Sequence, residues 1–146
     1  MFKKLINKIL KTPEVISFRQ SFDLTELAVI TLHQNDKKVN LILDSGSNDN
    51  VVDSNIINQL EYTSLDETSE LFGLEGSVQT VKKCNIDLSY EDRNYKCTFL
   101  ICDMKSAFDK IKKEIGVTVH GTLGTKFFNE HKYVLDFDKL VAYSKK

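Results

Sequence analysis

Four consecutive residues, Asp44, Ser45, Gly46 and Ser47, place a carboxylate, two hydroxyls and a glycine directly after the apolar run Leu41–Leu43. A carboxylate can take a proton from water and so act as a general base. Glycine lets the backbone turn tightly or approach a ligand closely. An ordinary turn at the end of a strand also favours aspartate, because its side chain bonds to local backbone groups. The tetrapeptide therefore fits either a reactive site or a plain turn, and the surrounding elements must distinguish the two.

A predicted β-hairpin delivers the tetrapeptide. The segments Leu27–Leu32 and Val39–Leu43 are rich in branched residues and flank the polar stretch 34–37, which is typical of a turn. The second strand of this hairpin ends immediately before Asp44. A buried, rigid strand would hold that carboxylate in a fixed position.

Strands predominate in the rest of the chain. Further strands are predicted from Val78 to Leu88 and from Tyr95 to Ile101, with two short ones near 133–136 and 140–143. Residues 61–70 are acidic and polar, and we interpret them as loop or weak strand. The pattern favours an all-β fold without internal repeats.

Few helices are expected. Asp53 or Ser54 could cap a short helix ending at Leu60, and the apolar spacing of residues 104–115 predicts a longer helix that begins after Asp103 and stops at Gly116. A last short helix is expected over 125–130. The apolar stripe of the longer helix is typical of core packing.

The N-terminal segment, residues 1–12, has apolar residues at helical spacing and lysines largely on the other face, which predicts an amphipathic helix. Its apolar stretches are too short for a secretory signal or a membrane-spanning helix. The helix could contact a membrane surface or dock on its own domain or a second subunit. We expect residues 1–20 to form this helix and a linker, and residues 21–146 to form one domain.

Composition narrows the functional class. The net charge is −1 over 146 residues, so nothing indicates binding to nucleic acid. Three cysteines without paired spacing argue against a disulfide framework and a zinc site and fit a cytoplasmic protein with small buried thiols. We expect no cofactor and no metal, and ordinary structural roles for the three histidines. The cysteines are Cys84, Cys97 and Cys102, and the histidines are His33, His120 and His131.

One family resemblance joins two distant elements. The sequence Leu-Ile-Leu-Asp-Ser-Gly-Ser at 41–47, followed far downstream by Thr122-Leu123-Gly124 and a short helix, resembles the retropepsin-like aspartic proteases. The resemblance extends from about Leu27 to Tyr143, and its ending looks like that of small bacterial members. It implies a closed acid-protease β-barrel and aspartic endopeptidase activity.

The chemistry of such a protease explains these residue types. Hydrolysis of a peptide without a metal or covalent nucleophile needs one group that takes a proton from water and another that protonates the carbonyl oxygen. Two carboxylates about 3 Å apart can do both, because they share one proton. This chain has one Asp-Ser-Gly, at Asp44. The resemblance therefore implies a homodimer in which each subunit provides one Asp44.

Further roles follow from the resemblance. Asp44 would activate water, Ser45 would bond across the dimer, and Gly46, with Ser47 beside it in the active-site loop, would give the substrate room. Thr122, Leu123 and Gly124 would form a second loop that supports the site. A flap over an extended peptide substrate is expected at the glycine-bearing hairpin tip, which consists of Gly73, Leu74, Glu75, Gly76 and Ser77.

Two positions depart from the family pattern. Asn48 stands where the family usually has a small hydroxyl residue, and His120 stands where an apolar residue is common. These departures and the single acidic motif motivate an alternative: a catalytically inactive peptide-binding or dimerisation module with the same fold. The fold is the same in both interpretations, and they differ in whether Asp44 acts on a peptide bond.

Overall fold

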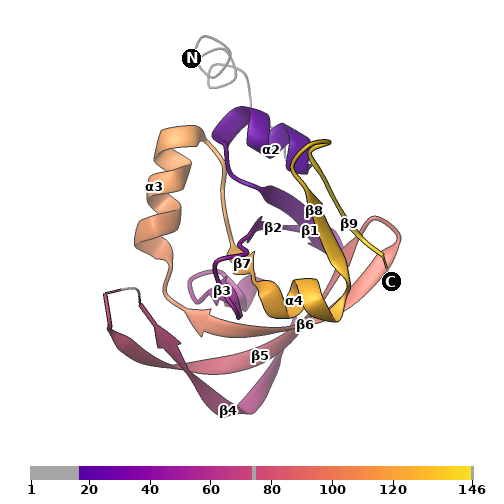
Figure 1. The fold of residues 1–146 in the computed structure, drawn as a ribbon. Helices are drawn as coiled ribbons and strands as arrows, with labels where there is room; N and C mark the ends of the chain where they lie inside the picture. Colours follow the sequence, from indigo (N-terminus) through magenta and orange to yellow (C-terminus); the bar gives the residue numbers. More distant parts are fainter. Residues whose placement is uncertain (1–16, 74, 146) are drawn as a thin grey trace.

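The computed structural model describes residues 17–73 and 75–145. Strands are the commonest elements of the described residues, with three short α-helices and one 3₁₀ turn placed around the sheet (Figure 1). In chain order the elements are α2 (Phe18–Thr25), β1 (Val29–Gln34), β2 (Lys37–Leu43), β3 (Asn50–Asp53), η1 (Ile57–Gln59), β4 (Thr63–Phe72), β5 (Val78–Tyr90), β6 (Arg93–Cys102), α3 (Lys105–Ile115), β7 (Gly121–Leu123), α4 (Thr125–Glu130), β8 (Tyr133–Asp136) and β9 (Val141–Ser144).

Six strands form a closed ring. The order in the main sheet is β1-β2-β7-β3-β6-β5, and β1 also pairs with β5 through His33 and Ser89, which closes the sheet on itself. Closure removes the free edges that an open sheet would present to other chains. The remaining strand of this sheet, β4, pairs with β5 and extends from the barrel as the outer arm of a hairpin (Figure 1). Strands β8 and β9 form a separate two-stranded sheet.

The barrel interior is filled by apolar side chains from alternate strand positions. In β6, Tyr95, Cys97 and Phe99 point inward while the residues between them are exposed, as the two-residue period of a strand requires. Leu41 and Leu123 are both fully buried and lie on the strands that lead to the two predicted active-site loops. All three cysteines are buried and free, as predicted.

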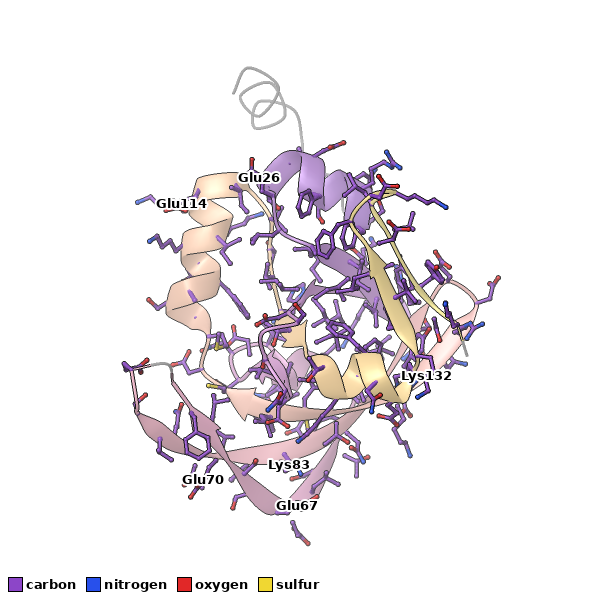
Figure 2. All side chains as sticks on the ribbon, in the orientation of Figure 1. Glu26, Glu67, Glu70, Lys83, Glu114 and Lys132 are labelled. Carbon is purple, nitrogen blue, oxygen red and sulfur yellow. The ribbon has the colours of Figure 1, made fainter. Side chains whose placement is uncertain are left out.

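The predicted hairpin before Asp44 is confirmed as β1 and β2, and the expected strands β5, β6, β8 and β9 are present. Residues 61–70 were interpreted as loop or weak strand. They are strand from Thr63 onward, as part of the ten-residue strand β4. It pairs along β5, with a bulge between Leu65 and Thr68. Its polar side chains face solvent, and Figure 2 shows Glu67 on this arm near Lys83, with which it forms an ion pair of 3.7 Å.

Two helical predictions are confirmed, one needs correction, and one helix was missed. Helices α3 and α4 are present, and Gly116 ends α3 in the left-handed conformation. The helix expected from residue 53 or 54 to Leu60 is reduced to the single turn η1, because Asp53 belongs to β3 and is buried. The helix α2 was not predicted.

Helix α2 begins with a capping box in which the hydroxyl of Ser17 accepts a hydrogen bond from the N–H of Gln20, and the Gln20 side chain accepts one from the N–H of Ser17. The expected amphipathic helix of residues 1–12 lies outside the described residues. Within the part of the chain that the structure describes, no helix is long and apolar enough to cross a membrane.

Candidate active site

Asp44 lies at the end of β2, where this strand runs parallel to β7. The two strands pair from Leu41 with Gly121 to Leu43 with Leu123. The backbone N–H of Asp44 continues the ladder and donates to the carbonyl of Leu123 at 2.9 Å. The two elements joined by the family resemblance therefore lie on adjacent strands. At the same end of the barrel, β2 leads into the Asp44 turn and β7 leads through Gly124 into α4.

The Asp44 carboxylate is held by its own turn. The N–H of Gly46 donates to Asp44 Oδ1 at 3.0 Å, and the N–H of Ser47 donates to the Asp44 carbonyl at 3.3 Å. A Cβ on residue 46 would lie 3.2 Å from Asp44 Oδ1, which is closer than most such contacts. Asp44 is half-buried, whereas Ser45 and Gly46 are exposed. The turn thus fixes one carboxylate oxygen of Asp44 next to two exposed residues.

The Gly124 loop, defined as Gly124 and the first turn of α4, contacts the loop after Asp44. The N–H groups of Thr125 and Lys126 donate to the carbonyls of Ser47 and Asn48 at 2.8 and 3.0 Å. The ammonium group of Lys126 lies 2.6 Å from Asp49 Oδ1. These contacts join the Asp44 loop and the Gly124 loop into one unit. Of the predicted second loop, Thr122 and Leu123 belong to β7.

Gly124 makes this close approach sterically feasible. A Cβ at position 124 would lie 2.6 Å from the carbonyl oxygen of Asp49 and 2.7 Å from that of Ser47. Distances below about 3 Å between a Cβ and backbone atoms require the backbone to move. The glycine that the sequence analysis identified is therefore required by packing between the loops.

Asn50 is a site residue that was not predicted. This side chain is 7 % exposed, and its Oδ1 accepts from the Gly124 N–H at 2.9 Å while its Nδ2 donates to the Thr98 carbonyl at 3.0 Å. Its amide links the Asp44 loop, the Gly124 loop and β6. A single asparagine inside a polar stretch gives no pattern in the sequence that would reveal this role.

Asn48 is accommodated by the loop. Its backbone carbonyl accepts from Lys126, and its side-chain Oδ1 accepts from the Thr125 hydroxyl at 3.3 Å. The residue is exposed. The departure from the family pattern at this position therefore preserves the connection between the two loops.

The predicted flap is the connection between β4 and β5. The N–H of Gly73 donates to the Ser77 carbonyl at 2.9 Å, and Gly76 adopts a φ of 92°, which favours glycine. The hydroxyl of Ser77 donates to the Glu75 carboxylate, and this bond lowers the pKa of Glu75, with its own backbone N–H contributing. Leu74 lies outside the described residues. The tip is a tight hairpin, as expected.

One face of this hairpin packs beside the site. Leu71 and Val81 contact a small apolar cluster that includes Val51, Leu100 and Cys102. Val51 belongs to β3, the strand that follows the Asp44 loop. The opposite face carries Phe72 and Val78, which pair across the hairpin and are exposed. Leu71 pairs with Gln79, one pair from the end of the hairpin, so the part of the hairpin next to its tip is anchored to the strand that follows the Asp44 loop.

The thiols are poor nucleophiles. Burial raises the pKa of Cys84 to about 11 and that of Cys97 to about 12, so almost no thiolate exists at neutral pH. Among residues 17–73 and 75–145, no group of three or more histidine, cysteine or acidic side chains could hold a metal ion. Asp44 is the acidic side chain that directly follows β2 at this end of the barrel.

Comparison with solved structures gives a match to the protease of EIAV in complex with the inhibitor HBY-793, with a TM-score of 0.51 and 15 % identity. The match covers 73 % of this chain and 89 % of that protease. The fold is retropepsin-like. No protein-family model and no curated protein matches the sequence. At this identity the likeness establishes the retropepsin-like architecture alone.

Proposed function

We propose that this protein is an aspartic endopeptidase that acts as a homodimer. The observation that carries the proposal is the position of Asp44, which the joined loops hold at the end of two parallel strands in a retropepsin-like barrel. The bond from Gly46 fixes one carboxylate oxygen. Such a carboxylate could activate water if a second acid lay opposite.

The proposed partner for Asp44 is the same residue in a second copy of this chain. The sequence has no other Asp-Ser/Thr-Gly, and an acid is needed to protonate the peptide carbonyl while the base takes a proton from water. A two-fold axis through the exposed turn would bring the two carboxylates together. The exposed Ser45 hydroxyl could then bond between the two loops.

The proposed substrate is an extended polypeptide. The β4–β5 hairpin would close over it, pair with its backbone in the manner of an added strand, and exclude water from the reacting bond. The exposed apolar pair Phe72 and Val78 supports such a role, because hydrophobic side chains on a projecting hairpin gain by covering a peptide. We also propose that the protein acts in the cytoplasm and resembles the bacterial type of the family.

The decisive variant is Asp44→Asn, which keeps the shape of the side chain and removes the ionisable group. Wild-type protein should cleave an unfolded polypeptide at mildly acidic pH, and the variant should lose at least about a hundredfold in kcat/KM, the size typical of a lost acid–base group. Mass spectrometry of the products would measure this loss.

Asp49→Asn is the matched control, because Asp49 lies in the same loop and pairs with Lys126. It should retain most of the activity, and circular dichroism should show both variants folded. Undiminished cleavage by the Asp44→Asn protein would contradict the proposal. Wild-type protein that binds unfolded peptides without cleaving them would favour the inactive peptide-binding module instead.

A further inference from the structure

His120 is the residue just before β7, and its side chain bonds to the neighbouring strand. The backbone N–H of Asn40 in β2 donates to His120 Nδ1 at 2.8 Å. The backbone N–H of His120 in turn donates to the Asn40 carbonyl at 2.8 Å. The imidazole thus takes the place of a backbone acceptor where the parallel ladder between β2 and β7 begins.

The His120 backbone also connects to a third strand. Its carbonyl accepts from the N–H of Asp53, the last residue of β3, at 2.9 Å. A polar group in the core supports the same junction, because the buried amide of Asn40 accepts from the Thr31 hydroxyl and donates to the Thr118 carbonyl. Strands β2 and β7 lead from this junction to Asp44 and to Gly124.

The hydrogen bond at Nδ1 fixes the protonation state of His120. A nitrogen that accepts from an N–H cannot carry a proton, so the ring is neutral with its proton on Nε2. Protonation of Nδ1 would set two donors against each other. Burial lowers the pKa of His120 below its ordinary value of 6.5, and the carboxylate of Asp53 partly opposes this shift.

Charged groups near His120 come from two strands. Lys37 and Lys38 of β2 line the same cavity of about 430 Å³ as the imidazole, and Asp53 of β3 is the acidic group that acts on it. The other residues that line the cavity are Val39, Ile56, Gln59 and Leu60, which are uncharged. Lys37 also donates to the Gln59 carbonyl. Two lysines thus line the cavity beside the ring and one carboxylate acts on it, and the ring accepts the Asn40 hydrogen bond only while it is neutral.

We propose that His120 is a pH-sensitive positioning residue, which holds β2 and β7, and through them the Asp44 and Gly124 loops, in place only while its ring is neutral. The positioning of the loops for catalysis rests on the proposed function. The hydrogen bond and its loss on acidification are independent of the proposed function.

The sign of the effect follows from the two states of the chain. In the unfolded chain His120 takes up a proton as the pH falls through about 6.5, whereas the folded chain resists protonation. The unfolded state then binds more protons than the folded state. The contribution of His120 to the free energy of unfolding is therefore fully present above pH 6.5, and it decreases as the pH falls toward the lower pKa of the folded state. Acidification should loosen the β2–β7 junction.

Nitrogen NMR of the wild-type protein tests the first step without any variant. At pH 7.5 the His120 ring should show a protonated Nε2 and a bare Nδ1 coupled to the Asn40 amide. Between pH 7 and pH 5 the hydrogen-exchange protection of the amides of Asn40, His120 and Asp44 should fall by about tenfold more than that of β5 and β6 amides. A protonated Nδ1 at pH 7.5, or equal losses across the barrel, would overturn the proposal.

Two substitutions distinguish the role of His120 as a hydrogen-bond acceptor from the effect of its protonation. Asparagine places a side-chain oxygen near the position of Nδ1, so His120→Asn should keep the bond and show a selective loss of protection no larger than about twofold over the same pH range. His33→Gln removes a histidine elsewhere on the barrel and should keep the wild-type loss. An unchanged selective loss in His120→Asn would overturn the proposal.

Activity is measured separately. If the protein cleaves polypeptides, the acid limb of its kcat/KM profile should move to lower pH in His120→Asn and stay in place in His33→Gln. If Asp44→Asn shows that the protein is not a protease, the exchange and NMR measurements still decide whether His120 controls the junction. Failure of the two proposals is thus distinguishable.

Discussion

At the scale of single residues, the site depends on two glycines, because a Cβ atom at either position would crowd its neighbours. Gly46 lets a backbone N–H reach the Asp44 carboxylate, and Gly124 lets two loops approach until their backbones are in contact. The atoms that crowd the two positions differ in kind. Beside Gly46 the nearest atom belongs to a side chain, and beside Gly124 the nearest atoms belong to backbone.

This difference predicts unequal costs for two similar substitutions. Gly124→Ala should lower the free energy of unfolding by about 2–3 kcal/mol, because the carbonyls of Ser47 and Asp49 must move away from the new Cβ. Gly46→Ala should cost less than about 1 kcal/mol, since the Asp44 side chain can shift. Urea unfolding monitored by circular dichroism measures both values, and equal costs would contradict the argument.

Both glycines could be identified from the sequence, because each follows an apolar strand within a motif. Asn50 and His120 could not be assigned their roles. Their hydrogen bonds join residues that are 74 and 80 positions apart in the chain, and neither lies in a periodic pattern. Such contacts depend on strand order, which the sequence alone did not provide.

At the scale of elements, periodic apolar residues made most strands and α3 predictable, and polar elements were missed or underestimated. The strand β4 is polar on most positions and is held by its ladder with β5. A polar sequence carries little information about such a partner. The helix α2 did have a signal, since Ser17 and Gln20 have the spacing of a capping box.

The joined loops behave as one element, and Asn50 is the side chain that connects them to β6. Asn50→Asp keeps the size of the side chain but replaces the amide donor, so the Thr98 carbonyl would face a carboxylate oxygen. The loss should be about 2–4 kcal/mol of unfolding free energy, because a buried group loses its partner and a charge is buried.

Asn48→Asp is the matched control for this variant. Asn48 is exposed, and its side chain contacts the Thr125 hydroxyl at the surface. The control should lie within about 0.5 kcal/mol of the wild type in the same denaturant experiment. A loss in Asn48→Asp as large as that in Asn50→Asp would show that the loop does not tolerate a carboxylate at any position.

At the scale of the whole molecule, the proposed activity requires two chains. If dimers exchange subunits, an equal mixture of wild type and Asp44→Asn should contain about one quarter wild-type dimers. Activity per total protein should then fall to about one quarter of that of the wild type, rather than to one half. The measurement is a cleavage assay after incubation of the mixed proteins.

The control for the mixing experiment uses Asp49→Asn in place of Asp44→Asn, which should leave the activity of the mixture near the wild-type value. Sedimentation of each protein at the assay concentration gives the fraction of dimer. A fall to one half in a mixture that exchanges subunits would contradict a site shared between chains.

The closure of the barrel rests on one pair of residues in the strand ladder and on side chains from both strands. Strands β1 and β5 pair at His33 and Ser89, the Ser89 hydroxyl donates to the His33 carbonyl at 3.3 Å, and the buried Gln34 side chain donates to the Asp87 carbonyl at 3.5 Å. A closed barrel opens most easily between the two neighbouring strands that share the fewest paired residues, which here are β1 and β5. This pair lies at the end of β1, next to the turn into β2. Asp44 follows the other end of β2. Thermal opening of the barrel would therefore begin between β1 and β5 and leave the reactive turn intact until later.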